Sequence, residues 1–284
     1  MLKLEDTIYG SWEADELLEE LILSAPMQRL KAVHQGGAIF LIDPSQRHTR
    51  YEHSLGVCWL VRHFGGSIEE QIAALLHDVS HTAFSHVGDQ VFGYSGEDYH
   101  EQIFTEVISR SEIPLILAKY GYDQVLTDFE RYTLLEQPLP ELCADRVDYT
   151  LRDLFHAGMI SQADINHFLI GLTVEGGRMV LTSETAARWI SRQFKRLNDE
   201  YFKKPEYLFA NQRMAEILKK AITDGVLERI DLQLDDDAVI AKLRRSGYED
   251  DLNALSKMQG FEHFAVKGAA ERLKRRELHP TIGS

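Results

Sequence analysis

Three histidines and an aspartate directly follow a run of small and apolar residues in the segment AALLHDVSHTAFSH, residues 73–86. The apolar run predicts a buried helix, and His77 and Asp78 stand at its end, where an unpaired charge costs several kcal/mol. A divalent metal ion offsets that cost, because neutral imidazole and carboxylate are ligands that such ions accept. The segment therefore requires a fold in which other parts of the chain bring further ligands to the same place.

Two other segments offer such ligands. His53 lies in RHTRYEHSLGVCWLV, at the start of a predicted helix with an apolar face. Asp145, Asp148 and Asp153 lie in CADRVDYTLRD, also predicted to be helical. One His, a His-Asp pair and one Asp complete a set of four ligands, although spacing alone does not choose between the first two aspartates, which are three residues apart.

His81 comes four residues after His77, and we expect it on the same helical face, as a donor to a ligand or to a phosphate. Its position within a histidine-rich stretch favours a functional role. Seven of the chain's histidines lie between residues 48 and 100: His48, His53, His63, His77, His81, His86 and His100.

Apolar residues recur at intervals of three and four along most of the chain, which predicts a fold dominated by helices. Gly176-Gly177 suits the turn of a small β-hairpin over 172–181, and the short apolar run at 36–45 predicts a strand or extended loop. The spacing of Leu17, Leu18, Leu21 and Ile22, continued toward Met27 and Leu30, predicts an amphipathic helix broken at Pro26. Further helices are predicted at 50–64, 68–79, 98–110, 112–119, 123–136, 138–156, 162–170, 183–202 and 206–221.

The 284 residues suffice for one large core with a smaller addition. The sequence becomes more polar after about residue 222. We therefore predict a main helical domain over 1–221, with its centre at about 25–205, and a C-terminal helical appendage over 222–284.

Charge and cysteine content exclude several classes of protein. The formal net charge is −14, from 45 acidic and 31 basic residues, which disfavours duplex nucleic acid as the main partner. Cys58 and Cys143 are the only cysteines, so no disulfide framework is available and a reducing cytoplasm is expected. The chain contains no run of about 18 apolar residues, so no membrane span is predicted.

The ordered pattern H…HD…D on helices resembles the HD-domain metal-dependent phosphohydrolases. The blocks RYEHSLGV (50–57), LLHDVSHTAFSH (75–86), YHEQ (99–102) and DRVDYTLRD (145–153) are similar to those of the deoxynucleoside triphosphate triphosphohydrolase branch. Ser80 and Ala83 depart from that branch, which usually has Gly and Pro there. The resemblance implies a compact all-α HD-domain bundle and a nucleotide or other small phosphorylated substrate.

The resemblance also implies roles for individual residues. The metal ligands would be His53, His77, Asp78 and Asp145. His81, His86, Asp89 and His100 would surround the scissile phosphate, with His100 as the candidate proton donor and Asp89 orienting or assisting it. Arg50, Arg146, Tyr149, Asp153 and Gln35 match positions on the substrate side.

These residues are compatible with more than one reaction and with several metal ions. The expected reaction is hydrolysis of a deoxynucleoside triphosphate to deoxynucleoside and triphosphate; a nucleoside monophosphate phosphatase, a pyrophosphatase or a phosphodiesterase is the alternative. A regulator that binds metal or nucleotide without turnover is the non-enzymatic alternative. The ion could be Mn, Fe, Zn, Mg, Co or Ni, since His- and carboxylate-containing sites accept several. The family habit implies a homodimer or larger assembly.

Overall fold

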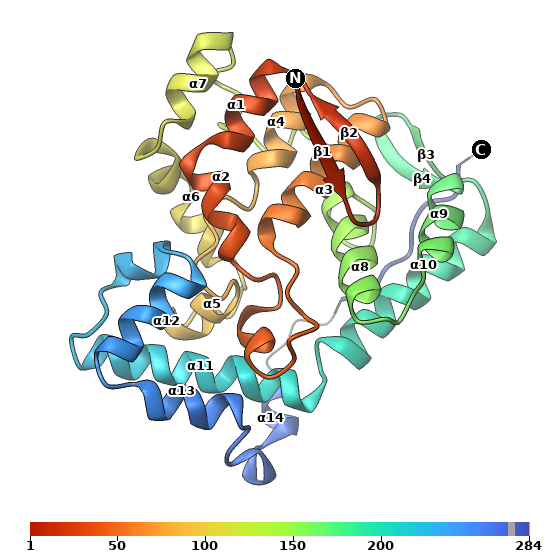
Figure 1. Ribbon diagram of the computed structural model, residues 1–284. Coiled ribbons are helices and arrows are strands. Elements are labelled where there is room, and N and C mark those ends of the chain that lie inside the picture. The colour runs from red at the N-terminus through yellow and green to blue at the C-terminus, as the bar shows by residue number, and fades with distance from the viewer. Residues whose placement is uncertain (272–275, 284) are drawn as a thin grey trace.

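The structure, a computed structural model, describes residues 1–271 and 276–283. Within these residues the fold is mainly helical, and its strands form two separate antiparallel hairpins. Figure 1 shows the helices arranged around α3 (Arg50–His63), which lies near the middle of the molecule. The prediction of an all-α bundle with a small β-hairpin is confirmed.

The elements follow one another along the chain as two groups. The first half contains β1 (Leu2–Asp6), β2 (Gly10–Ala14), α1 (Glu16–Leu23), α2 (Ala25–Arg29), η1 (Leu30–Ala32), η2 (Gly37–Leu41), α3, α4 (Ile68–Leu76), α5 (Val87–Phe92), α6 (Tyr99–Ser109) and α7 (Ile113–Tyr120). The second half contains α8 (Ala144–His156), α9 (Gln162–Ile170), β3 (Leu172–Glu175), β4 (Arg178–Leu181), α10 (Glu184–Arg196), η3 (Leu197–Tyr201), α11 (Pro205–Thr223), η4 (Arg229–Gln233), α12 (Asp236–Arg245), α13 (Glu249–Ser256), η5 (Phe261–His263) and α14 (Val266–Ala270).

Most predicted helices are observed close to their expected limits, because the apolar residues and the capping residues of each helix indicate the same limits. Thr49 caps α3 with a reciprocal pair of contacts to Glu52, and the Ser67 hydroxyl caps α4. The predicted hairpin at 172–181 is also observed, and both Gly176 and Gly177 have positive φ there.

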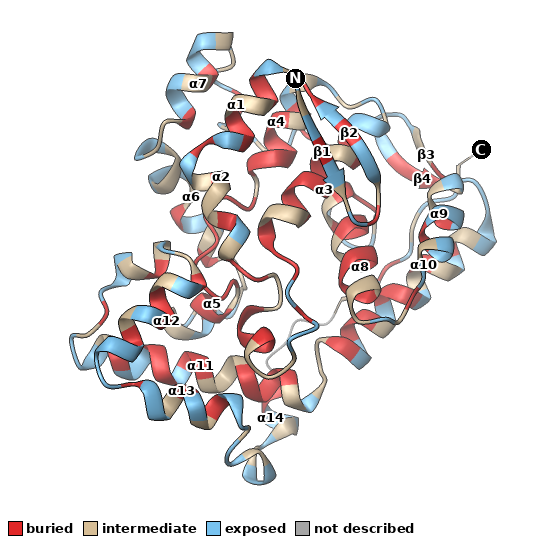
Figure 2. Cartoon of the chain, in the orientation of Figure 1, coloured by how far each residue is buried: buried red, intermediate tan, exposed pale blue. Residues whose placement is uncertain are grey.

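The main core lies between α1, α3, α4, α8 and α10. Its fully buried residues include Leu18, Leu60, Ile72 and Leu151, one from each of the first four helices. Figure 2 shows buried positions concentrated on the central helices α3, α4 and α8. These three helices carry the segments in which the metal ligands were predicted, so the candidate site is attached to the most deeply buried part of the fold.

The N-terminal hairpin β1–β2 was not predicted. Leu2 pairs with Ala14 and Leu4 with Trp12, and the side chains of Leu4, Trp12 and Ala14 are buried in the main core. Alternation of apolar and polar residues on each side of TIYG is the signal that could have revealed it. Glu5 and Glu13 occupy exposed positions between the buried ones.

The prediction of a strand or extended loop at 36–45 is wrong. The segment forms the short 3₁₀ helix η2, which buries Ala38 and Phe40. The Ala38 amide donates to Asn211 Oδ1 on α11 over 2.8 Å, so its partner is a helix side chain and not a neighbouring strand. Gly37 has a φ of +73°, and a Cβ there would lie 2.7 Å from the same Asn211 oxygen.

The predicted helix at 123–136 is wrong as well, and the one predicted at 138–156 begins only at Ala144. The 123–136 segment consists of turns, although Leu134 and Leu135 are buried. Their amides donate to Glu70 Oε1 on α4 over 2.7 and 3.2 Å. A tertiary carboxylate therefore satisfies backbone groups that the periodic pattern assigned to a helix. Pro140 disfavours the helical conformation for the residue before it, which opposes an earlier start of α8.

A second buried cluster joins distant parts of the sequence. It contains Ala38, Phe40, Ala83, Phe84 and Val87, packed against buried residues between 214 and 255. Residues on both sides of the predicted boundary at 221–222 share this cluster, and the boundary itself stays a prediction. The predicted appendage also includes residues 272–275 and 284, which lie outside the described residues. No helix in the described ranges is both long and apolar enough to span a bilayer.

Candidate active site

Four predicted metal ligands meet where α3, the end of α4 and the start of α8 come together. His53 Nε2 lies 3.0 Å from Asp145 Oδ1 and 3.6 Å from Asp78 Oδ2. His77 Nε2 lies 3.5 Å from Asp145 Oδ1 and 3.5 Å from Asp78 Oδ1. Ligand atoms at about 2.0–2.2 Å from one divalent ion are separated by roughly 3.0–3.5 Å. The four side chains therefore have the spacing of a single coordination sphere.

The hydrogen bonds on the far side of each imidazole direct the other nitrogen toward this centre. His77 Nδ1 donates to the Ala74 carbonyl over 2.8 Å, which leaves the lone pair on Nε2. That Nε2 is buried and has no hydrogen-bond partner among the described residues. His53 Nδ1 donates to Asp148 Oδ2 over 2.7 Å. A carbonyl or carboxylate behind a ligating histidine is the usual arrangement in metal sites.

The electrostatics of the cluster also suit a cation. Burial lowers the pKa of His53, but hydrogen bonds to Asp145 and Asp148 outweigh this effect and raise it to about 10. Burial would raise the pKa of Asp78, yet Arg50 and the neighbouring histidines hold it well below its usual range. The centre is thus rich in carboxylate charge, and these residues fit a divalent ion.

A second cluster, of imidazoles, lies beside the first. His81 and His100 are stacked with ring centroids 3.9 Å apart, and His86 approaches both rings edge-on. Burial lowers the pKa of His100 to about 3, so this ring is neutral. Burial and the nearby Arg50 likewise hold the pKa of His81 well below its usual value. A neutral imidazole carries one N–H, which can donate to a phosphate oxygen, and one lone pair, so the nitrogens of these three rings could also hold a metal ion.

The structure changes two expectations about these histidines. His81 does not continue the helix of His77, because α4 ends at Leu76 and the following residues form turns. Asp89 was expected to orient His100, but it accepts a hydrogen bond from His86 Nδ1 over 3.0 Å and another from the Tyr99 amide. The His86 side chain is 42% exposed, which leaves its ring accessible from the pocket.

The segment that carries His81 and His86 has an unusual backbone. Phe84 and Ser85 have φ of 59° and 51°, a region that residues other than glycine rarely occupy. Asp236, the first residue of α12, accepts the Phe84 amide over 2.6 Å and also the amide and Nδ1 of His34. The Ala83 amide donates to the Leu232 carbonyl over 2.8 Å. Residues about 150 positions further along the chain therefore hold this segment in place.

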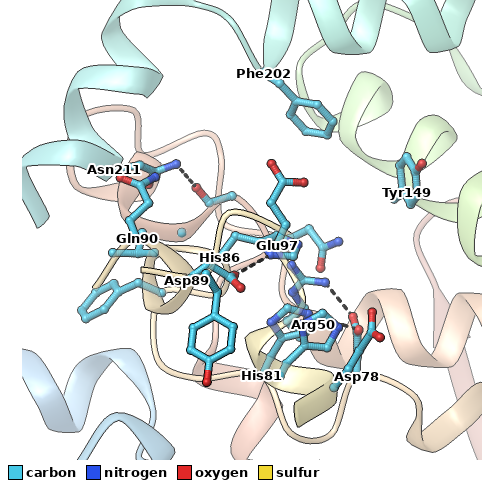
Figure 3. Close-up of a pocket in the computed structure, with 18 of the residues that line it drawn as sticks. Arg50, Asp78, His81, His86, Asp89, Gln90, Glu97, Tyr149, Phe202 and Asn211 are labelled. Carbon is cyan, nitrogen blue, oxygen red and sulfur yellow. Dashed lines mark hydrogen bonds and ion pairs between the residues drawn. The ribbon is translucent and has the colours of Figure 1, made fainter. Parts of the chain in front are cut away.

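The two arginines predicted on the substrate side, Arg50 and Arg146, donate hydrogen bonds to different partners. Arg50 Nη1 donates to Asp78 Oδ2 over 2.7 Å and its Nε donates to Ser85 Oγ over 3.0 Å, so it connects the two clusters. Figure 3 shows Arg50 between His81 and Asp78. Arg146 lines the same pocket, but its guanidinium donates to Glu136 Oε1 and to the Gln137 and Glu141 carbonyls. Its role toward substrate stays a prediction.

The remaining substrate-side residues line the same pocket, which has a volume of about 1490 Å³. Tyr149 lies across from the histidines in Figure 3. Asp153 accepts a hydrogen bond from His48 Nε2 over 2.7 Å, a contact between residues 105 positions apart that local spacing does not predict. The Gln35 side-chain oxygen is buried and has no partner among the described residues. The pocket thus brings together all the predicted site residues, with the metal-ligand cluster and the imidazole cluster side by side.

Comparison with known proteins identifies relatives over most of the chain. A family model described as HD domain matches residues 50–153. The uncharacterized protein YdhJ of Bacillus subtilis is 50% identical over 258 residues, covering 90% of this chain and 79% of YdhJ. Metal-dependent phosphohydrolase cns2 of Cordyceps militaris is 32% identical over 265 residues, covering 90% of this chain and 77% of cns2.

A more distant relative and a solved structure are also similar to this chain. Human SAMHD1, a deoxynucleoside triphosphate triphosphohydrolase, is 25% identical over 221 residues, which cover 60% of this chain and 35% of SAMHD1. The crystal structure of a hypothetical protein from Aquifex aeolicus superposes with a TM-score of 0.69 at 27% identity, covering 91% of this chain and 76% of that one. The chain belongs to the HD-domain family of metal-dependent phosphohydrolases, which use a divalent metal ion.

Proposed function

We propose that this chain hydrolyses deoxynucleoside triphosphates to deoxynucleoside and triphosphate. One observation carries the proposal: the four predicted metal ligands and the three imidazoles of His81, His86 and His100 line a single pocket of about 1490 Å³. That volume accommodates a nucleotide with three phosphates. The similarity to SAMHD1 supports the same substrate class.

In the proposed reaction water attacks the α-phosphorus and the bond from phosphorus to the 5′ oxygen breaks. A divalent ion held by His53, His77, Asp78 and Asp145 would supply positive charge that polarises the phosphate and eases deprotonation of water. The 5′ oxygen leaves with a proton, which a positioned acid can provide. His86 fits this role better than His100, because Asp89 orients its ring while the ring stays accessible.

The other residues bind and orient in this proposal. The neutral rings of His81 and His100 would donate hydrogen bonds to phosphate oxygens, and Arg50 would add charge beside them. Tyr149 and Asp153, four residues apart on α8, would pack against the deoxyribose and leave little room for a 2′-hydroxyl. This arrangement favours deoxynucleotides over ribonucleotides.

A nucleoside monophosphate phosphatase is the second candidate, and the pairing of the cations favours it. Arg50, Arg146 and Arg276 line the pocket, and each forms an ion pair with a carboxylate of the chain, namely Asp78, Glu136 and Glu97. A triphosphate has to compete with these carboxylates for the guanidinium groups. A single phosphate needs less compensation.

The products of a nucleotide panel decide between the two. Deoxy- and ribonucleoside mono-, di- and triphosphates are incubated with the purified protein and Mn²⁺, and the products are separated by ion exchange. Inorganic triphosphate from deoxynucleoside triphosphates supports the proposal. Orthophosphate from monophosphates, with triphosphates intact, overturns it in favour of the second candidate. Absence of any phosphate release, in a protein that binds the metal, points to the non-enzymatic regulator.

A further inference from the structure

The candidate ligand His53 is connected to the N-terminal hairpin by a continuous series of polar contacts. His53 Nδ1 donates to Asp148 Oδ2 over 2.7 Å. The Arg152 guanidinium, one turn further along α8, donates to both oxygens of Asp148 over 2.9 Å. The same Arg152 Nη2 donates to Asp6 Oδ2 over 2.9 Å. The series therefore runs from β1 through α8 to α3.

All four side chains are shielded from water. The side chains of Asp148 and Arg152 have no exposed surface, and those of His53 and Asp6 are 1% and 3% exposed. A buried charge without a partner is strongly destabilising, so each member depends on its neighbours. Because Arg152 forms a two-pronged pair with Asp148, its position fixes the plane of that carboxylate.

Asp6 is itself held at the turn of the hairpin. Its Oδ1 accepts the amides of Ile8 and Tyr9 over 2.9 and 3.0 Å, while Oδ2 accepts from Arg152. The carboxylate thus joins the backbone of the turn to the guanidinium, and a displacement of the turn displaces Arg152.

The turn is packed firmly against the helices beneath it. The Tyr9 ring stacks on Trp59 of α3, with centroids 4.5 Å apart and planes 6° from parallel. Gln162 Nε2 on α9 donates to the Ile8 carbonyl over 2.8 Å. Figure 1 shows the hairpin beside α3 and α8. A Cβ on Gly56 of α3 would lie 2.1 Å from Asp148 Oδ1, so α3 leaves no free space around the ion pair.

We propose that Asp6 and Arg152 are positioning residues for metal binding: the docked N-terminal hairpin fixes the Arg152 guanidinium, which fixes Asp148 and hence the ring of His53. This inference rests on the proposed function only in taking His53 as a metal ligand. Groups that orient a ligating histidine typically contribute about 10–100-fold in metal affinity. The inference extends the metal site to a hairpin outside the matched segment 50–153.

The test compares three variants for metal binding. Asp6→Asn keeps an oxygen for the two amides but removes the charge that faces Arg152, and Arg152→Lys keeps a charge but loses the fork. Glu5→Gln, at an exposed position on the same strand, is the matched control. The metal is removed with a chelator, and the affinity for Mn²⁺ is then measured by calorimetry at 25 °C.

We expect Mn²⁺ affinity to fall about tenfold in Arg152→Lys, with a smaller loss in Asp6→Asn and none in Glu5→Gln. In the Arg152→Lys background, adding Asp6→Asn should lower the affinity less than it does in the wild type, because the two residues act through the same contact. Circular dichroism and the melting temperature of the chelated variants show whether each is folded.

A purely structural role predicts a different result. If Asp6→Asn melts at a lower temperature than the wild type but binds Mn²⁺ as tightly, the inference is overturned. A wild-type chain that takes up no Mn²⁺ overturns the assignment of His53 and the inference with it. A wild-type chain that binds Mn²⁺ and hydrolyses no nucleotide refutes the proposed function alone, because the affinity measurements still test the inference.

Discussion

The two sides of the pocket are constructed in different ways. The metal side is attached to helices: His53 lies within α3, His77 and Asp78 follow α4 directly, and Asp145 lies in the first turn of α8. On the imidazole side, His100 lies in the first turn of α6, but His81 and His86 depend on the turns between α4 and α5, where Phe84 and Ser85 have positive φ. Such a conformation persists only when its surroundings impose it.

The surroundings of the two sides differ accordingly. The helices of the metal side pack in the main core, and all four predicted ligands have partners between residues 48 and 153. The imidazole side is held by Asp236 and Leu232 from the C-terminal region. The comparison teaches that the predicted metal ligands and the turn of His81 and His86 have different main supports, although Arg50 connects the two. Substitutions should therefore be able to impair one without the other.

The largest expected effect is on the metal side. Asp145→Ala should lose metal and hydrolysis together, since Asp145 Oδ1 lies within 3.5 Å of Nε2 of both His53 and His77, the predicted ligands. At a Mn²⁺ concentration about 100 times the dissociation constant, the ion stabilises the wild type by about 2.7 kcal/mol, and the variant should not gain this stability. Elemental analysis and thermal melts with and without Mn²⁺ check both, with Asp123→Ala as the exposed control. Equal metal content in wild type and Asp145→Ala would contradict the ligand assignment.

A large effect on the imidazole side should leave metal binding intact. His86→Gln should lower kcat about 100-fold or more, because it removes the proposed proton donor. Its Mn²⁺ affinity, measured by calorimetry, should equal that of the wild type. Asp89→Asn should reduce kcat less, since the ring is present but less well oriented. Wild-type turnover in His86→Gln together with inactivity in His100→Gln would return the donor role to His100.

An intermediate effect is expected from substituting Asp236, which holds the turn of the imidazole side. Asp236→Asn replaces one acceptor oxygen by an amide that cannot accept, which leaves a buried N–H without a partner and costs about 1–3 kcal/mol of stability. We expect kcat to fall about tenfold as the ring of His86 becomes misplaced, by the reasoning that small displacements are costly in catalysis. Mn²⁺ affinity should not change. Asp237→Asn, exposed on the same turn of α12, is the control, and a loss of metal affinity in Asp236→Asn would mean that the two supports are not separate.

The smallest expected effect concerns Asp153, one of the predicted substrate-side residues of the pocket. His48→Gln weakens the hydrogen bond that orients Asp153, so KM for the nucleotide should rise about threefold while kcat stays near the wild-type value, as expected for a group that assists binding alone. Steady-state kinetics separate the two parameters. A change in kcat with unchanged KM would assign His48 to the chemical step.

The sequence predicts the metal side well and the imidazole side only in part. His53 and Asp145 lie on helices with apolar faces, and the His77-Asp78 pair directly follows such a helix, so their positions relative to the core follow from local pattern. The choice between Asp145 and Asp148 came from the family resemblance, and the structure pairs Asp148 with Arg152. Helical spacing failed for His81, because α4 ends at Leu76 and the carbonyls of Val79 and His81 accept hydrogen bonds from the distant Arg29.

Other features that the sequence did not predict also depend on contacts between residues far apart in the chain. Arg146 is held by Glu136 and by carbonyls of the turns before α8, and those turns form because Glu70 accepts the amides of Leu134 and Leu135. Contacts between residues about 65 positions apart leave no signal in local spacing. The N-terminal hairpin had a detectable alternation, and its link to His53 through Arg152 required the structure.

The contact between Phe84 and Asp236 also sets an order of events during synthesis. When the ribosome has completed α8, every metal ligand and every pocket histidine is already present, yet the carboxylate that holds the Phe84 amide has not been made. Domains begin to fold from the N-terminus as they emerge. The growing chain is therefore expected to assemble its predicted metal centre first and to fix the turn of His81 and His86 only after α12 has been added.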